Sequence, residues 1–330
     1  MKSIEGYQDV INQAIEERIN RRDFQEPTGL YDPCKYILQN GGKRVRASLV
    51  LMASKMFSNS YMQAIPVAIA FETFHNFTLI HDDIMDKASI RRGKPTVHVK
   101  WNENTAILSG DAVMIMAYRF FEESGEYMPK LFNLLNTTAL EVCEGQQYDI
   151  DLELTHVQSP EVTMPAYIKM IELKTSVLLA ACLKAGAIVG GASAADADKL
   201  YEVGRNIGIA FQLQDDVLDS YGNEATFGKR IGGDISENKK TCLLISALNT
   251  LQGADRNALV QLVSDTTISE KDKLEQVRAL YNKAQVKETT LEQIKDYFSK
   301  ASTIVDAISI PDSQKTELRL FMNELINRIY

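Results

Sequence analysis

The chain has 330 residues, of which 45% are hydrophobic and 24% charged, with 18 glycines and 8 prolines. This composition is typical of a folded globular protein and excludes a disordered or fibrous chain. The formal net charge of -8 at pH 7 excludes the broad basic surface of a general nucleic-acid-binding protein, so we expect no nucleic-acid partner.

Residues 1–24 are charged and amphipathic and lack the apolar centre of a signal peptide. The most apolar segment, residues 176–191, is interrupted by Lys184 and is too short to span a bilayer, so we expect no integral membrane segment. The four cysteines are scattered and form no Cys-x-x-Cys pair. Together these features predict a cytoplasmic protein with reduced thiols.

Helical periodicity continues along the whole chain, and no run of alternating strand residues is convincing. The predicted helices cover residues 4–19, 66–85, 105–123, 129–150, 165–189, 195–221 and 241–250. Three more are expected between residues 270 and 330, with breaks near residues 285–287 and at Pro311. Because no break resembles a flexible linker, we predict a single all-α domain over residues 1–330.

The motif Asp-Asp-x-x-Asp occurs at residues 82–86 and again at residues 215–219. Residues four apart share one face of a helix, where like charges repel unless a cation lies between them. Oxygen ligands without His or Cys suit Mg²⁺ completed by substrate phosphates, whereas the alternative is a pair of solvated helix ends. The candidate metal ligands are Asp82, Asp83, Asp86, Asp215, Asp216 and Asp219.

Basic residues follow both motifs and also precede the first one. Arg91 and Arg92 lie in a short loop closed by glycine and proline, and the stretch Gly-Gly-Lys-Arg-Val-Arg at residues 41–46 is a candidate phosphate-binding loop. Lys174 lies in an apolar helix, where a lysine needs a partner. Each motif alone is also compatible with a solvated surface turn, and taken alone residues 41–46 favour that interpretation.

Taken in chain order, these motifs resemble the trans-isoprenyl diphosphate synthases of the polyprenyl synthetase family. The matching segments are residues 41–46, 72–86, 91–98, 109–112, 144–151, 174–175, 208–222 and 227–241. The resemblance implies the all-α isoprenoid synthase fold around a deep central cavity, a homodimer, and three Mg²⁺ ions. It also implies condensation of isopentenyl diphosphate with an allylic diphosphate. Ala47 and Asn238 depart from the family, which commonly has Pro and Gly there.

The resemblance also implies roles for the basic and polar residues. The allylic diphosphate would be bound by Arg91, Lys174, Lys229 and Lys239, and the isopentenyl diphosphate by Lys43, Arg46, His75 and Arg92. Thr175 and Gln212 would lie near the allylic carbon. Asp82, Asp86 and Asp215 would be the main metal ligands, with Asp83, Asp216 and Asp219 supporting them.

The pattern before the first motif is similar to that of geranylgeranyl-type enzymes, so geranylgeranyl diphosphate is the expected product and farnesyl diphosphate the alternative. The growing tail would run along the aspartate face of the helix, limited by Phe77, Thr78, Phe74 and Met114, although these phenylalanines could equally be core residues. A class I terpene cyclase and a non-catalytic subunit of a heteromeric synthase are competing hypotheses. The second Asp-Asp-x-x-Asp copy and the retained aspartates argue against both.

Overall fold

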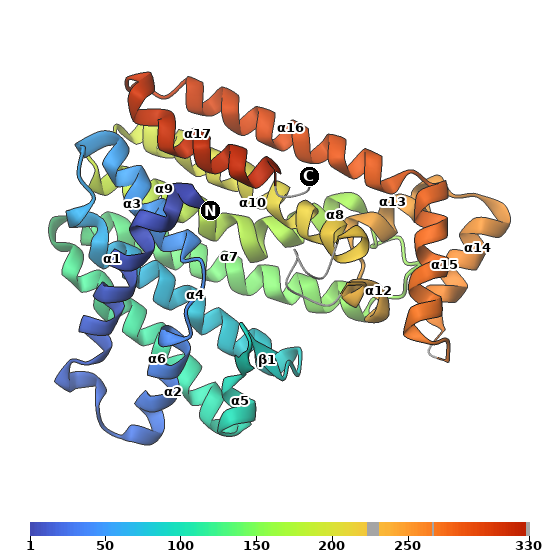
Figure 1. The fold of residues 1–330 in the computed structure, drawn as a ribbon, viewed down its shortest axis with the longest axis horizontal. Coiled ribbons are helices and arrows are strands. Elements are labelled where there is room, and N and C mark those ends of the chain that lie inside the picture. The colour runs from blue at the N-terminus through green and yellow to red at the C-terminus, as the bar shows by residue number, and fades with distance from the viewer. Residues whose placement is uncertain (223–230, 266, 328–330) are drawn as a thin grey trace. The chain divides into compact units, whose positions relative to one another are not determined.

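In the computed structural model, which describes residues 1–222, 231–265 and 267–327, the chain is almost entirely helical (Figure 1). It divides into two compact units. The first unit comprises Met1–Asn136, Ala181–Tyr201 and Ile308–Phe321, and the second comprises Thr137–Ala180, Glu202–Ala307 and Met322–Tyr330. The prediction of a single domain over residues 1–330 stays a prediction.

The first unit contains the amino-terminal helices and one short hairpin. Its elements are α1 (Lys2–Ile19), η1 (Arg22–Phe24), α2 (Thr28–Gln39), α3 (Val45–Ser58), η2 (Met62–Ala64), α4 (Ile65–Met85), β1 (Ile90–Arg91), β2 (Lys94–Pro95), α5 (Val97–Lys100), α6 (Glu103–Phe121) and η3 (Glu122–Tyr127). Four helices have residues in both units: α7 (Met128–Leu154), α9 (Val177–Val189), α10 (Ala194–Tyr221) and α17 (Asp312–Ile326).

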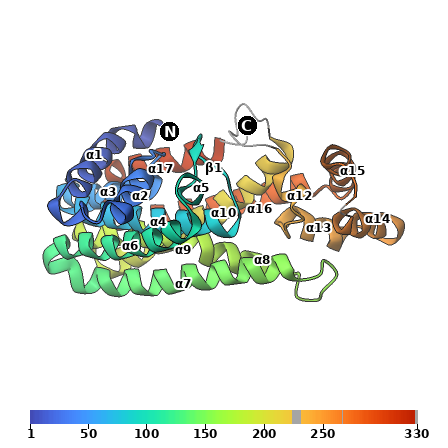
Figure 2. The same ribbon diagram turned by 90° about the horizontal axis from the view of Figure 1, so that it is seen from below.

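The second unit contains the remaining elements. These are α8 (Met164–Ile171), the π-helical turn η4 (Glu172–Ser176), α12 (Gly233–Ser236), α13 (Cys242–Thr250), α14 (Gly253–Ser264), α15 (Glu270–Lys283) and α16 (Val286–Asp306). Helices α13, α14 and α15 contact one another and lie together in both views (Figures 1 and 2).

Helix α4 is the centre of the first unit because it is apolar around most of its circumference. It contacts α1, α2, α3 and α6, and Pro66 occupies its first turn, where no backbone N–H is needed. Phe71 of α4 meets Phe121 of α6 edge to face, with ring centroids 5.3 Å apart. This packing fixes the direction of α4 and therefore the position of the aspartates at its carboxyl end.

The predicted helices were placed well, with three corrections. The helix expected over residues 165–189 is interrupted by the π-helical turn η4. Residues 90–95 form a small antiparallel hairpin, whose turn residues Arg92 and Gly93 both have positive φ. Helices α2, α3 and α14 lie outside the predicted ranges; α14 buries only Leu259 and Val263 and so carries a weak apolar pattern. None of the helices in the described part of the chain has the length and apolar character needed to cross a bilayer.

Candidate active site

The first aspartate motif lies at the carboxyl end of α4, in the first unit. Asp82 and Asp86 are one helical turn apart and at least partly exposed, and the backbone N–H of Asp86 caps the helix by donating to the Asp82 carbonyl over 2.8 Å. Asp83 is buried and receives Nε and Nη2 of Arg91 at 2.8 Å. Burial raises the pKa of Asp83, and the Arg91 guanidinium opposes that rise. Arg91 thus fixes the middle aspartate, and the two outer ones remain accessible.

A basic cluster lies beside the same helix, with more positive charge than its neighbours balance. Arg46 donates through Nη1 to Nε2 of His75 over 3.0 Å; because a guanidinium can only donate, this imidazole is neutral at Nε2. Burial, and then Arg46, Arg92, Arg91 and Arg44, lower the pKa of His75 well below its ordinary value. The buried Nε of Arg46 has no hydrogen-bond partner among the described residues. The cluster is therefore prepared for an anion.

Arg44 has a different role from Arg46, although the two are close in sequence. Its guanidinium is buried and satisfied: Nη1 reaches Glu72 at 3.1 Å, Nη2 reaches the Leu38 carbonyl at 2.6 Å, and Nε reaches Asn12 at 3.0 Å. Arg44 therefore joins α1, α2 and α4 and is not available to a ligand.

The glycines before α3 allow a close approach of Arg92. Gly42 has φ +119°, a conformation that strongly favours glycine, and a Cβ there would lie 2.7 Å from the Arg92 guanidinium carbon. Arg92 also donates to the Gly41 carbonyl, and burial lowers its pKa. Lys43 is exposed beside this contact. The structure thus brings Lys43, Arg46, His75 and Arg92 to one region of the first unit.

The residues proposed to limit product length line α4 and α6. Phe74 is fully buried, and its ring centroid lies 5.4 Å from that of Phe77. Phe77 in turn meets the His81 ring at 5.0 Å, next to α6. Thr78 and Met114 are half-buried. Phe74 is therefore a core residue, whereas the partly accessible positions near it are the ones that could contact a ligand.

The second aspartate motif lies near the carboxyl end of α10, in the second unit. Asp216 is buried, accepts the Tyr167 hydroxyl at 2.5 Å and accepts the backbone N–H of Cys242 at 3.1 Å. Burial raises the pKa of Asp216, and these hydrogen bonds oppose the rise. Asp215 and Asp219 are half-buried and one turn apart. As in the first motif, the middle aspartate is held by the protein.

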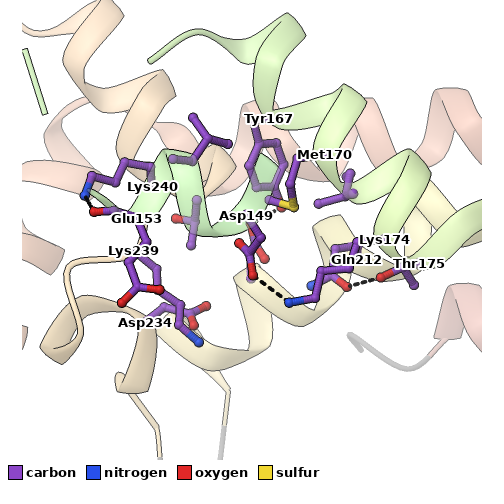
Figure 3. Close-up of a pocket in the computed structure, with 14 residues that line it drawn as sticks. Asp149, Glu153, Tyr167, Met170, Lys174, Thr175, Gln212, Asp234, Lys239 and Lys240 are labelled. Atoms are coloured by element: carbon purple, nitrogen blue, oxygen red, sulfur yellow. Dashed lines mark hydrogen bonds and ion pairs between the residues drawn. The ribbon is translucent and has the colours of Figure 1, made fainter. Parts of the chain in front are cut away.

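A pocket of about 130 Å³ opens next to this motif, lined by residues of α7, α8, η4, α10 and the segment before α13 (Figure 3). Lys174 donates to Asp149 over 2.5 Å, and Thr175 donates through Oγ1 to Oε1 of Gln212 over 3.4 Å. The partner that Lys174 was expected to need is therefore Asp149. Met170, Ile171 and Leu152 supply an apolar part of the wall.

Lys174 and Thr175 lie within the π-helical turn, a distortion that is frequent at functional sites. The backbone of this turn passes very close to α7, because a Cβ at Gly145 would lie 2.2 Å from the Lys174 nitrogen. Only glycine at position 145 allows this contact. It sets the position of Lys174 relative to Asp149, which lies one turn further along α7.

Two lysines after α12 complete the lining of the pocket. Lys239 is exposed and forms an ion pair with Glu237 at 3.1 Å, and Lys240 donates to the Glu153 carbonyl at 2.6 Å. Asp234 faces the same pocket, where burial, Asp216 and Asp219 raise its pKa. Lys229, which was also predicted to bind the allylic diphosphate, lies outside the described residues.

The donor set of each motif fits Mg²⁺. In each, two accessible carboxylates lie one turn apart, and both motifs supply oxygen only. Among the described residues, no group of three or more metal-binding side chains converges on one point. Mg²⁺ typically takes one or two carboxylates and completes its octahedron with water and phosphate oxygens, which is the kind of donor that each motif offers. The expectation that the two motifs face each other stays a prediction, since they belong to different units.

Sequence reasoning did not assign roles to Asp149, Tyr167, Glu153 or Lys240. Asp149 lies in a segment that matched the family, so its place beside Lys174 could have been suspected. Tyr167 gave no signal, because its partner Asp216 is 49 residues away and no local pattern relates the two.

The all-α fold and the two aspartate motifs, each with lysines or arginines nearby, define a prenyltransferase of the prenyl diphosphate synthase class. The family model described as polyprenyl synthetase matches residues 27–282, so the chain belongs to the polyprenyl synthetase family.

Relatives and solved structures agree with this assignment. A geranylgeranyl diphosphate synthase from Methanosarcina mazei is 42% identical over 240 residues, which cover 72% of each chain. A geranylfarnesyl diphosphate synthase from Natronomonas pharaonis is 35% identical over 271 residues, covering 76% of this chain and 77% of that one. A crystal structure of a geranylgeranyl pyrophosphate synthase superposes with a TM-score of 0.92 at 40% identity, covering 100% of both chains.

Proposed function

We propose that this protein condenses isopentenyl diphosphate with dimethylallyl, geranyl and farnesyl diphosphates and gives geranylgeranyl diphosphate. The observation that carries the proposal is the unbalanced charge of the basic cluster around Arg46 and His75. A half-buried guanidinium whose Nε is buried without a partner, and whose described partner at Nη1 is a neutral imidazole, is costly unless an anion joins it. A diphosphate on isopentenyl diphosphate supplies that charge, with Lys43 and Arg92 at its edge.

The allylic substrate is assigned to the two aspartate motifs and the pocket lysines. Asp82, Asp86 and Asp215 would hold three Mg²⁺ ions, with Asp83, Asp216 and Asp219 in support. When bound, these ions would neutralise the allylic diphosphate and ease the departure of diphosphate. Lys174, Lys239, Lys229 and Arg91 would bind the same diphosphate. For Lys174 and Lys239, the ion pairs with Asp149 and Glu237 must loosen when the substrate arrives.

The remaining chemistry follows from the polar and apolar walls. Oxygen dipoles of Thr175 and Gln212 would stabilise positive charge on the allylic carbon, because they are fixed before the reaction. Met170, Ile171 and Leu152 keep water from that carbon. Arg46 and His75 hold the diphosphate of isopentenyl diphosphate, which places its double bond for attack. The released diphosphate takes the final proton.

The product length is tested directly by chromatography of the products from each allylic primer. The M. mazei relative supports geranylgeranyl diphosphate, and the half-buried Thr78 next to the Phe77 ring supports a tail that runs along α4. Replacing Phe77 by Ser should give longer products. The same change at the fully buried Phe74 should lower stability instead. An unchanged product distribution in Phe77→Ser would reject Phe77 as the limit. A farnesyl product, or consumption of allylic diphosphate without isopentenyl diphosphate, would reject the proposal.

We also propose a homodimer, which the exposed apolar face of α6 supports. Leu108 and Ile115 are seven residues apart on this face and are 60% and 56% exposed. Seven residues are two helical turns, so the two side chains form one apolar stripe. Light scattering of the purified chain should give twice the mass of one chain. Ile115→Glu should shift that mass toward the monomer, whereas Arg119→Glu, one turn further along the same exposed face, should shift it less.

A further inference from the structure

Helix α12 ends in a structured cap. Asn238 has φ +58°, the N–H of Lys239 donates to the Asp234 carbonyl over 2.9 Å, and the N–H of Asn238 donates to the Ile235 carbonyl over 3.3 Å. These two bonds with a left-handed residue form a Schellman cap. Gly is the usual residue at that position, and Asn is the common substitute. The backbone alone therefore does not explain why a larger side chain is present.

The Asn238 side chain accepts a hydrogen bond from a buried lysine. Nζ of Lys273, on α15, lies 2.6 Å from Oδ1 of Asn238 and 3.3 Å from the Asp265 carbonyl. Lys273 is 4% exposed, and burial lowers its pKa. Ordering and desolvating an ammonium is unfavourable, so well-placed hydrogen-bond acceptors must offset the cost of burying Lys273. A glycine at position 238 would remove one of these two partners.

The rest of α15 also packs against α12. Lys273, Val277 and Tyr281 recur every four residues and are buried, so they form the inner face of the helix. The Leu274 side chain lies directly over Gly232 at the start of α12. Helix α12 is also bonded to α10, since the backbone N–H of Asp234 donates to Asp219 Oδ2 over 3.1 Å. Helix α12 is thus held by α10 at its start and by Lys273 at its end.

We propose that Lys273 is a positioning residue for the allylic diphosphate site: through Asn238 it fixes the end of α12 so that Lys239 faces the substrate. This inference depends on the proposal above that Lys239 binds the allylic diphosphate. Lys239 is the next residue after Asn238, and its own ion pair with Glu237 is exposed and therefore weak. Without the Lys273 contact the cap would still form, but the direction of Lys239 would be less defined.

The test is a double-mutant cycle on the wild-type background, with steady-state kinetics for both substrates and thermal melting. Asn238→Gly keeps the left-handed backbone and removes the acceptor. Lys273→Met keeps the aliphatic stem and removes the donor. Asn238→Asp keeps an acceptor that tolerates positive φ and serves as the conservative rescue. Lys271→Met, at an exposed position of α15, is the matched control, and Lys239→Ala tests the site itself.

Asn238→Gly and Lys273→Met should each raise KM for the allylic diphosphate by about three- to tenfold, with KM for isopentenyl diphosphate unchanged. The double variant should be no worse than either single one, because both remove the same hydrogen bond. Asn238→Asp and Lys271→Met should retain the wild-type values.

Four results would overturn the inference. The first is a fall in melting temperature without a change in either KM, which would make Lys273 a purely structural residue. The second is full additivity in the double variant. The third is an unchanged allylic KM in Lys239→Ala, which would remove the role of Lys239 as well. A larger KM in Lys239→Ala with normal Asn238→Gly kinetics would contradict only the inference about Lys273. If Lys273→Met does not fold, Asn238→Gly and Asn238→Asp still decide the matter.

Discussion

The two regions proposed to bind diphosphate balance their charges in opposite ways. In the first unit, Arg46 and Arg92 contact an imidazole and a backbone carbonyl, and neither forms an ion pair with a carboxylate among the described residues. In the second unit, Lys174 and Lys239 each have a carboxylate partner. Under the proposed function, the first region is therefore preorganised for a bare diphosphate. The second must exchange partners, which suits a substrate whose charge is shared with Mg²⁺.

The largest effect should come from the accessible aspartates of both motifs. Asp82→Ala and Asp215→Ala should each reduce kcat by at least about 100-fold, because each removes a ligand whose charge acts on the departing diphosphate. Steady-state assays at saturating Mg²⁺ measure this, and Asp9→Asn, an exposed carboxylate on α1, is the control. Retention of normal turnover by either variant would exclude its motif from the reaction.

The next effect separates Arg46 from Arg44. Arg46→Met should raise KM for isopentenyl diphosphate about tenfold to one hundredfold, since a charge-assisted contact is lost. Its melting temperature should stay or rise, because a half-buried charge without an ion-pair partner is removed.

Arg44→Met should behave in the opposite way. It should lower the free energy of unfolding by roughly 3–5 kcal/mol, because Glu72 then lacks its buried partner. Thermal melting and kinetics of both variants check the contrast. Similar losses of stability in both would mean that the first region is not preorganised.

A smaller effect should follow from weakening the ion pair between Lys174 and Asp149 in the second unit. Asp149→Asn keeps an acceptor for Lys174 and removes the competing charge, so inorganic diphosphate without metal should bind about two- to fivefold more tightly. Titration calorimetry measures the affinity, and Asp151→Asn on the exposed part of α7 is the control. Weaker binding would show that the substrate does not displace Asp149.

The smallest effect concerns pH. The pKa of His75 is lowered in the folded state by burial and by the arginines, so the unfolded state takes up a proton first as the pH falls. Above the unfolded pKa of about 6.5 this histidine is neutral in both states, and the free energy of unfolding keeps its full value. As the pH falls below that pKa, the unfolded state binds the proton and the free energy of unfolding decreases. The melting temperature should fall between pH 7 and pH 5, by a few degrees less in His75→Gln. Equal slopes for both proteins would contradict a neutral, half-buried His75.

Much of the architecture was accessible from the sequence. Helical spacing located α4, α10 and the three carboxyl-terminal helices, because apolar periodicity over many residues is a strong local signal. The hairpin at residues 90–95 was not recognised, since it has two residues in each strand and depends on positive φ at its turn. The π-helical turn was not recognised either, because it depends on the close contact with Gly145.

The sequence by itself determined the ligand chemistry of this protein: which residues carry negative oxygen, which carry fixed positive charge, and the one-turn spacing that pairs them. Only the tertiary structure decided how each charge is used. It separates Arg44, which is satisfied inside the first unit, from Arg46, which is not. It also joins Tyr167 to Asp216 and Lys273 to Asn238. Such pairs depend on contacts between distant segments, and local spacing carries no information about them.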